Sequence, residues 1–140
     1  MKDYTQQFRA QVRSAVFRGL ETCAAIVEAD AVLNCPVHDS LLRNSIYRKL
    51  NRAQYTATVG ATAEYAAAVE YGRKPGKMPP IEALKKWARD VLGSEKLAYV
   101  VARAIGKKGT SPQPFMRPAI DNNQARLDAA FNREMSGVTR

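Results

Sequence analysis

The first quarter of the chain carries a single hydrophobic stripe at helical spacing. Apolar residues recur there at steps of three and four: Phe8, Val12, Ala15, Val16, Leu20, Cys23, Ile26 and Val27. This spacing places them on one face of an α-helix. Asp3 and Gln6 have the spacing of a capping box at its start, and Pro36 cannot continue a helix. The pattern therefore predicts a long helix over residues 3–33.

After residue 45 the apolar period changes to two. Apolar and polar residues alternate over residues 46–50 and again over 55–59, which predicts two strands of an antiparallel hairpin. Residues 36–44 are predicted to connect the helix to the hairpin, with room for one helical turn capped by Asp39 or Ser40. Residues 63–71 suit a helix by their alanines and a strand by their spaced aromatics. We expect a short helix that passes into a third strand ending at Gly72.

Three further helices are predicted downstream. One follows Pro80, carries Trp87 on its apolar face and ends at Gly93. The next begins at a Ser94 cap and is broken at Gly106. The last is marked by Ile120, Leu127, Ala130, Phe131 and Met135. The sequence thus predicts an α+β fold, with a long N-terminal helix and further helices packed on a small, mainly antiparallel sheet. Its 140 residues are typical of a single domain.

Residues 110–119, Thr-Ser-Pro-Gln-Pro-Phe-Met-Arg-Pro-Ala, form a proline-rich arm. Each proline fixes φ, lacks a backbone donor and restricts the residue before it. The arm is therefore predicted to be stiff and extended from Pro112 to Pro118. A stiff segment loses little entropy on docking, which fits an element that lies against a partner surface. Phe115 must dock on its own subunit or on a neighbouring one, and both alternatives remain open.

Three motifs carry a resemblance to a known family. Residues Pro114–Ala119 resemble the Pro-Phe-(apolar)-Arg-Pro-Ala signature of a tailed-phage family of minor tail, neck and tail-completion proteins. Pro36–Ile46 is similar to that family's Pro-Val-x-Thr-Gly-x-Leu-x-x-Ser-Ile stretch, and Tyr65–Gly72 to its Tyr-Ala-x-x-Val-Glu-(aromatic)-Gly stretch. The order and spacing of the motifs agree. Asp39-Ser40 replaces the usual Thr-Gly and Arg73 replaces a frequent Thr, which affects the loops more than the identity.

The resemblance implies a structural virion protein and not an enzyme. It implies a neck, tail-completion or tail-terminator role in tail assembly or head–tail joining. The expected partners are further copies of the chain, in a ring with six-fold symmetry favoured, and neighbouring phage neck and tail proteins. We expect subunit or partner docking through Pro112, Pro114, Phe115, Met116, Arg117, Pro118, Glu70 and Tyr71. We further expect the Arg117 guanidinium to pair with Glu70, within one subunit or across two.

The net charge of +9 is the one unusual feature of the composition. Such a charge attracts nucleic acid or other anionic surfaces. Arg73, Lys74 and Lys77 make the most basic short segment, and we expect this loop to be exposed and to contact a partner protein or packaged DNA. A basic nucleic-acid-binding module is therefore the alternative function. No helix-turn-helix, RNA-recognition or zinc spacing supports it.

The chemistry of an enzyme is poorly represented. One histidine and two cysteines argue against a zinc site or a disulfide framework. His38, Asp39 and Ser40 are consecutive, whereas the members of a catalytic triad come from separate elements. No apolar run approaches the roughly 18 residues that span a bilayer, and the N-terminus lacks the apolar core of a signal peptide. We expect no catalytic site, cofactor, metal or membrane contact, with synthesis in the bacterial cytoplasm and a final place in the virion.

Overall fold

The structure is a computed structural model that describes residues 2–36 and 40–138. Its elements follow one another along the chain as α1 (Lys2–Asn34), α2 (Ser40–Asn44), β1 (Ile46–Asn51), β2 (Thr56–Ala61), α3 (Ala66–Tyr71), α4 (Ile81–Leu92), α5 (Leu97–Lys108), α6 (Met116–Asp121) and α7 (Gln124–Ser136). The predicted α+β class, with a long first helix and a small antiparallel sheet, is confirmed.

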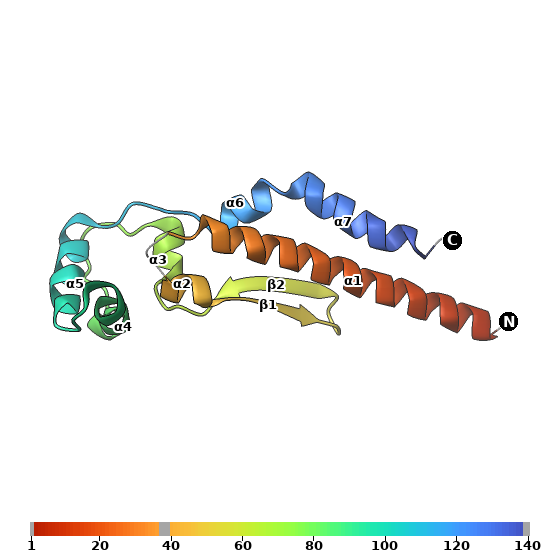
Figure 1. The fold of residues 1–140 in the computed structure, drawn as a ribbon, viewed down its shortest axis with the longest axis horizontal. Helices are drawn as coiled ribbons and strands as arrows, with labels where there is room; N and C mark the ends of the chain where they lie inside the picture. Colours follow the sequence, from red (N-terminus) through yellow and green to blue (C-terminus); the bar gives the residue numbers. More distant parts are fainter. Residues whose placement is uncertain (1, 37–39, 139–140) are drawn as a thin grey trace.

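Helix α1 is the spine of the molecule. Its 33 residues span about 50 Å at the usual rise of 1.5 Å per residue. The hairpin lies along one side of it and α6 and α7 along the other (Figure 1). The first turns of α1 extend beyond the hairpin and beyond α7, which leaves Tyr4 and Phe8 exposed. The predicted capping box is not formed at Asp3, because this residue is already helical.

Strands β1 and β2 pair in register from Ile46 opposite Ala61 to Asn51 opposite Thr56. The side-chain oxygen of Asn51 accepts hydrogen bonds from the amides of Ala53 (3.0 Å) and Gln54 (3.1 Å), which closes the turn. Within the described residues the sheet has two strands, so the predicted third strand is wrong. Its alanine-rich segment forms helix α3 instead, as helix propensity favours.

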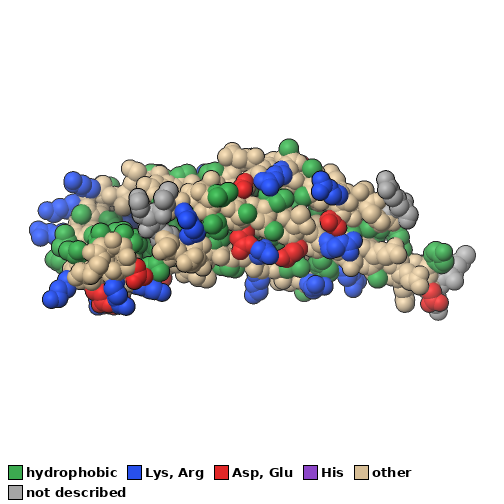
Figure 2. All heavy atoms as spheres, in the orientation of Figure 1, with side chains coloured by type: hydrophobic (Ala, Val, Ile, Leu, Met, Phe, Trp, Pro, Cys, Tyr) green, Lys and Arg blue, Asp and Glu red, His purple; other side chains and the backbone are tan. Residues whose placement is uncertain are grey.

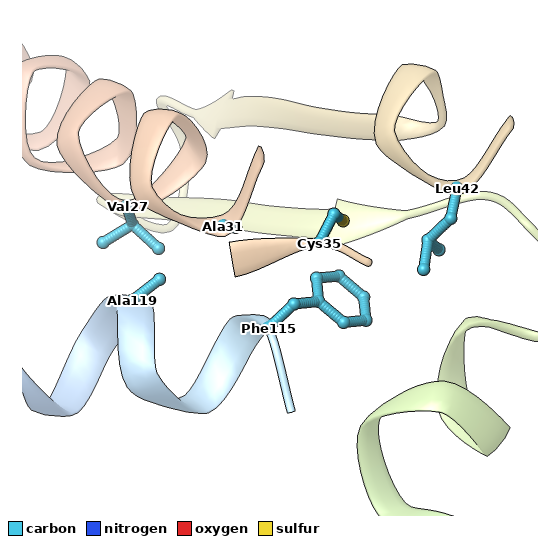
Figure 3. Packing of buried hydrophobic residues seen from close by; sticks show 6 residues of the cluster. All are labelled: Val27, Ala31, Cys35, Leu42, Phe115 and Ala119. Atoms are coloured by element: carbon cyan, nitrogen blue, oxygen red, sulfur yellow. The ribbon is translucent and has the colours of Figure 1, made fainter. Parts of the chain in front are cut away.

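The main hydrophobic core lies where α1, α2 and α6 meet. Phe115 leads into α6 and points toward Cys35 at the end of α1 and Leu42 of α2, while Ala119 faces Val27 (Figure 3). Ala31 and Ala119 are both fully buried. Their small side chains allow α6 to lie close against α1, so this core depends on close helix contact around one large ring.

Helices α4 and α5 form a second apolar cluster at the end of the molecule opposite the N-terminus (Figure 1). Leu84 and Ala88 of α4 pack against Ala98 and Ala102 of α5, with the half-buried Trp87 beside them. The predicted end of α4 at Gly93 is confirmed; this residue adopts the left-handed conformation, with φ of 76°.

Two boundaries of the later helices differ from the prediction. Helix α5 begins at Leu97 without a side-chain cap from Ser94, and it continues through Gly106 to end before Gly109. The last predicted helix is two helices, because the chain turns at Asn123, whose side chain donates to the carbonyl of Ala119 at 2.9 Å. These corrections leave the order of the elements unchanged.

Candidate docking site

Glu70 connects α3 to the proline-rich arm. Its Oε2 accepts hydrogen bonds from the backbone amides of Phe115 (2.8 Å) and Met116 (3.0 Å), and its Oε1 accepts one from the amide of Arg117 (2.9 Å). The side chain is only 9 % exposed. Burial acts to raise the pKa of this carboxyl, but the three backbone hydrogen bonds and the charge of Arg117 outweigh it and lower the pKa from its ordinary value.

These three amides belong to the start of α6, where backbone donors have no partner inside the helix. Phe115 precedes the helix and provides no side-chain cap, so Glu70 supplies the cap from a distant segment. A carboxylate there also interacts favourably with the positive end of the helix dipole. The motifs led us to expect contact between Glu70 and Arg117, but they did not indicate that Glu70 would accept hydrogen bonds from the backbone of α6.

The arm is extended only as far as Pro114. The prediction that it stays extended to Pro118 is wrong, because Pro118 lies in the first turn of α6. Proline is tolerated in that turn, since its missing amide has no intrahelical acceptor there. The error has a clear cause: three prolines in seven residues suggest extended backbone unless a remote cap is known to begin a helix among them.

The extended part of the arm is fixed to its own subunit. The amide of Gln113 donates to the carbonyl of Val69 at 2.8 Å, and Arg73 and Thr110 exchange two backbone hydrogen bonds at 2.9 and 2.8 Å. A Cβ at Gly72 would lie 2.7 Å from the Thr110 carbonyl oxygen, so only glycine permits this approach. The arm therefore lies against α3 through its backbone.

Phe115 docks inside its own subunit. Its side chain is 1 % exposed and belongs to the main core. Of the two alternatives that the sequence left open, the structure shows the intramolecular one. Phe115 is thus a core residue that fixes the arm.

The Arg117 side chain lies outside this core and is 76 % exposed, with its Nε 3.8 Å from a carboxylate oxygen of Asp121. Within the chain, the expected ion pair between the Arg117 guanidinium and Glu70 is not formed. The two residues do meet, but through the Arg117 amide. Glu70 already accepts three amide hydrogen bonds, and the guanidinium points to the solvent side.

A surface hollow of about 440 Å³ lies where α3 meets α6. Its lining combines exposed side chains with the half-buried Met116, and we call the following set the docking surface: Tyr71, Met116, Arg117, Ile120 and Asp121. Tyr71 is 73 % exposed and Ile120 44 %. The structure thus brings together five of the expected docking residues: Tyr71, Met116 and Arg117 belong to the docking surface, and the buried Glu70 and Phe115 also line the hollow. Sequence reasoning missed Ile120 and Asp121, because these two residues reach the hollow only when the segment that contains them is helical.

Pro112 and Pro114 are exposed along the arm, while Lys74 and Lys77 are exposed in the loop that follows α3. Arg73 is half-buried there, where its backbone pairs with Thr110. Within the part of the chain that the structure describes, none of the three cations of this loop takes part in an ion pair. The loop therefore presents uncompensated positive charge to solvent.

Residues 2–36 and 40–138 also bear on other kinds of site. No group of three or more His, Cys, Asp or Glu residues is arranged there to hold a metal ion. No described helix is both long enough and apolar enough to cross a membrane. His38 and Asp39 lie outside the described residues. Burial, and next the charge of Asp128, raise the pKa of the Cys23 thiol.

Comparison with known families adds an independent finding. The family model described as "Bacteriophage HK97-gp10, putative tail-component" matches residues 1–72, just over half of the 140 residues. The matched part comprises α1, α2, the hairpin and α3, and thus includes Glu70 and Tyr71. The match does not extend to the Pro114–Ala119 motif. No curated protein and no solved structure shows a significant match to the chain.

Proposed function

The chain belongs to the HK97-gp10-like family of bacteriophage tail components, and we propose that it is a structural virion protein at the head–tail junction or the tail end. It would have a neck, tail-completion or tail-terminator role and no catalytic one, and would act as a single domain needed for tail assembly or head–tail joining. The observation that carries this proposal is the family match over α1, α2, β1, β2 and α3.

We infer that copies of the chain form a closed ring, with six-fold symmetry favoured. The molecule is elongated, with both termini at one end and the α4–α5 pair at the other (Figure 1). Two different surfaces of such a molecule can meet in a head-to-tail contact, and contacts of this kind close into a ring when the rotation between subunits allows it. Neighbouring neck and tail proteins would contact the faces of the ring.

The docking surface supplies the contact that we propose. Tyr71 and Ile120 expose apolar area beside the exposed charges of Arg117 and Asp121, and interfaces commonly combine aromatic anchors with a charged rim. Pro112 and Pro114 extend this surface along the arm. Glu70 and Phe115 act indirectly, since they hold α6 and the arm in place and keep the surface preorganised.

Electron microscopy of the purified protein and of virions tests the role directly. We expect ring-shaped density with cyclic symmetry at the neck or tail end. A single asymmetric copy in each virion, or absence from virions, contradicts the proposal.

A variant pair tests the surface. Tyr71→Arg with Ile120→Arg places two charges on the docking surface, and Tyr99→Arg with Val100→Arg makes the same change at two exposed apolar positions of α5. We expect both proteins to fold with nearly unchanged melting temperatures, because exposed positions affect stability little. Only the first should fail to complete infectious particles. If both variants assemble equally well, the docking surface has been assigned incorrectly.

A further inference from the structure

The structure brings two separate basic segments into one surface. The loop after α3 contributes Arg73, Lys74 and Lys77, and the last turns of α5 contribute Arg103, Lys107 and Lys108. We call these six residues the basic surface. Lys and Arg side chains gather on the α5 end of the molecule, where acidic side chains are visible on the lower side and none among the Lys and Arg side chains at the upper left (Figure 2).

Backbone contacts hold the two segments together. The amide of Gly76 donates to the carbonyl of Gly106 at 2.9 Å. A Cβ at Gly106 would lie 3.1 Å from the Cα of Met78, so the loop passes directly over the end of α5. The exchange of backbone hydrogen bonds between Arg73 and Thr110 fixes the other side of this contact. The cations are therefore presented from a fixed backbone.

The basic surface has little compensating negative charge. No acidic residue occurs between Glu70 and Glu82 or between Glu95 and Asp121 in the sequence. Among the described residues, none of the six cations takes part in an ion pair. The C-terminal end of α5 carries a partial negative charge of about half a unit. This dipole explains a lysine in the last turn but offsets only a small part of six positive charges.

We propose that the basic surface binds the phosphate backbone of duplex DNA without reading its sequence. Duplex DNA carries one negative charge for about every 1.7 Å of its length. Five exposed cations and the half-buried Arg73, on a fixed backbone, match such a ligand without a preformed pocket. An acidic protein partner would be expected to bury an apolar core as well. The loop between α3 and α4 exposes one large apolar side chain, Met78, and those that α5 exposes, Leu97, Tyr99 and Val100, all precede its cations. Competition with an acidic polypeptide therefore forms part of the test. The inference goes beyond the proposed tail role and does not depend on ring formation.

Fluorescence anisotropy of a labelled 20-base-pair duplex of random sequence, titrated with the full chain at several salt concentrations, tests the proposal. Each phosphate neutralised contributes about −0.9 to the slope of log K against log salt. Lys74→Gln, Lys77→Gln, Lys107→Gln and Lys108→Gln together should weaken binding at least about tenfold at 0.1 M salt. They should also reduce the magnitude of the slope by roughly 3 to 4.

The control variant removes the same four charges elsewhere, at Arg9, Arg13, Lys49 and Arg133, all exposed and all changed to Gln. We expect it to bind DNA within about threefold of the parent chain, since only long-range charge is lost. Circular dichroism melts should show that both variants are folded.

Three outcomes would overturn the proposal. The first is equal weakening in the two variants, which would mean that net charge alone drives binding. The second is no binding of the parent chain at 50 mM salt. The third is displacement of the duplex by polyglutamate at equal concentrations of charge, which would assign the surface to acidic proteins instead. Failure of DNA binding with normal rings in micrographs leaves the tail role standing, and the reverse result leaves DNA binding standing.

Discussion

The carboxylate of Glu70 lies 2.8 Å from the backbone amide of Phe115, although 45 residues separate the two in the chain. This hydrogen bond and those to the next two amides place the start of α6 against α3. The same contact leaves Phe115 in the main core and Tyr71 on the surface. One buried side chain therefore organises both the packing and the docking surface of the molecule.

Glu70→Gln should destabilise the protein by about 1–3 kcal/mol. Both oxygens of the carboxylate accept amide hydrogen bonds, whereas glutamine would offer an NH₂ group to one of these donors. Urea unfolding followed by circular dichroism measures the change. The control is Glu64→Gln, at an exposed position in the same region, which should stay within about 0.5 kcal/mol of the parent chain. Equal effects of the two changes would show that the cap contributes nothing.

The same carboxyl should make stability depend on pH. Its pKa is lowered in the folded protein from an ordinary value of 4.5. A group with a lowered folded pKa contributes its stability above the unfolded pKa and loses it as the pH falls through the folded pKa. Unfolding free energies measured from pH 7 to pH 3 should therefore decline more steeply below about 4.5 in the parent chain than in Glu70→Gln. Parallel profiles for the two proteins would contradict this assignment.

Phe115→Ala should cost about 3–5 kcal/mol, the usual range for removing a buried phenylalanine. The ring is 1 % exposed and forms the centre of the main core. Phe8→Ala is the matched control, because it makes the same chemical change where the ring is 54 % exposed, and it should leave the unfolding free energy nearly unchanged. If the Phe8 variant were the less stable of the two, the placement of Phe115 would be wrong.

Arg117→Lys should be nearly neutral for stability. The guanidinium is 76 % exposed, and its partner Asp121 is 65 % exposed; exposed pairs contribute little. Lysine keeps the backbone amide that donates to Glu70. A thermal melt should show no more than a small shift, and a loss as large as that of Glu70→Gln would mean that the guanidinium has a structural role.

The sequence was most informative where one local pattern decides the structure. The 3.6-residue stripe predicts α1, and the alternation of apolar and polar residues predicts the hairpin, since both patterns reflect a single buried face. The candidate site was less accessible. Its motifs brought Glu70 and Arg117 together correctly, but hydrogen bonding between α3 and the backbone of α6 cannot be deduced from spacing. That remote cap also converted part of the predicted extended arm into helix.

The contact between α1 and α7 offers a further test, because Gly19 faces the ring of Phe131. A Cβ at Gly19 would lie 2.6 Å from Cδ2 of that ring, which is closer than the two atoms can approach. In an unobstructed helix, replacing glycine by alanine stabilises by about 0.5–1 kcal/mol. Here the steric conflict should dominate, and Gly19→Ala should destabilise by about 1–2 kcal/mol.

Removing the Phe131 ring should reverse the sign of this effect: in a Phe131→Ala background, the same Gly19→Ala change should be stabilising. The two residues should therefore show a coupling energy of roughly 1.5–3 kcal/mol in a double-mutant cycle. Gly137→Ala, where the nearest neighbour of a new Cβ is 3.5 Å away, is the control and should be tolerated in either background. Equal effects of Gly19→Ala with and without the ring would mean that α1 and α7 do not pack through this pair.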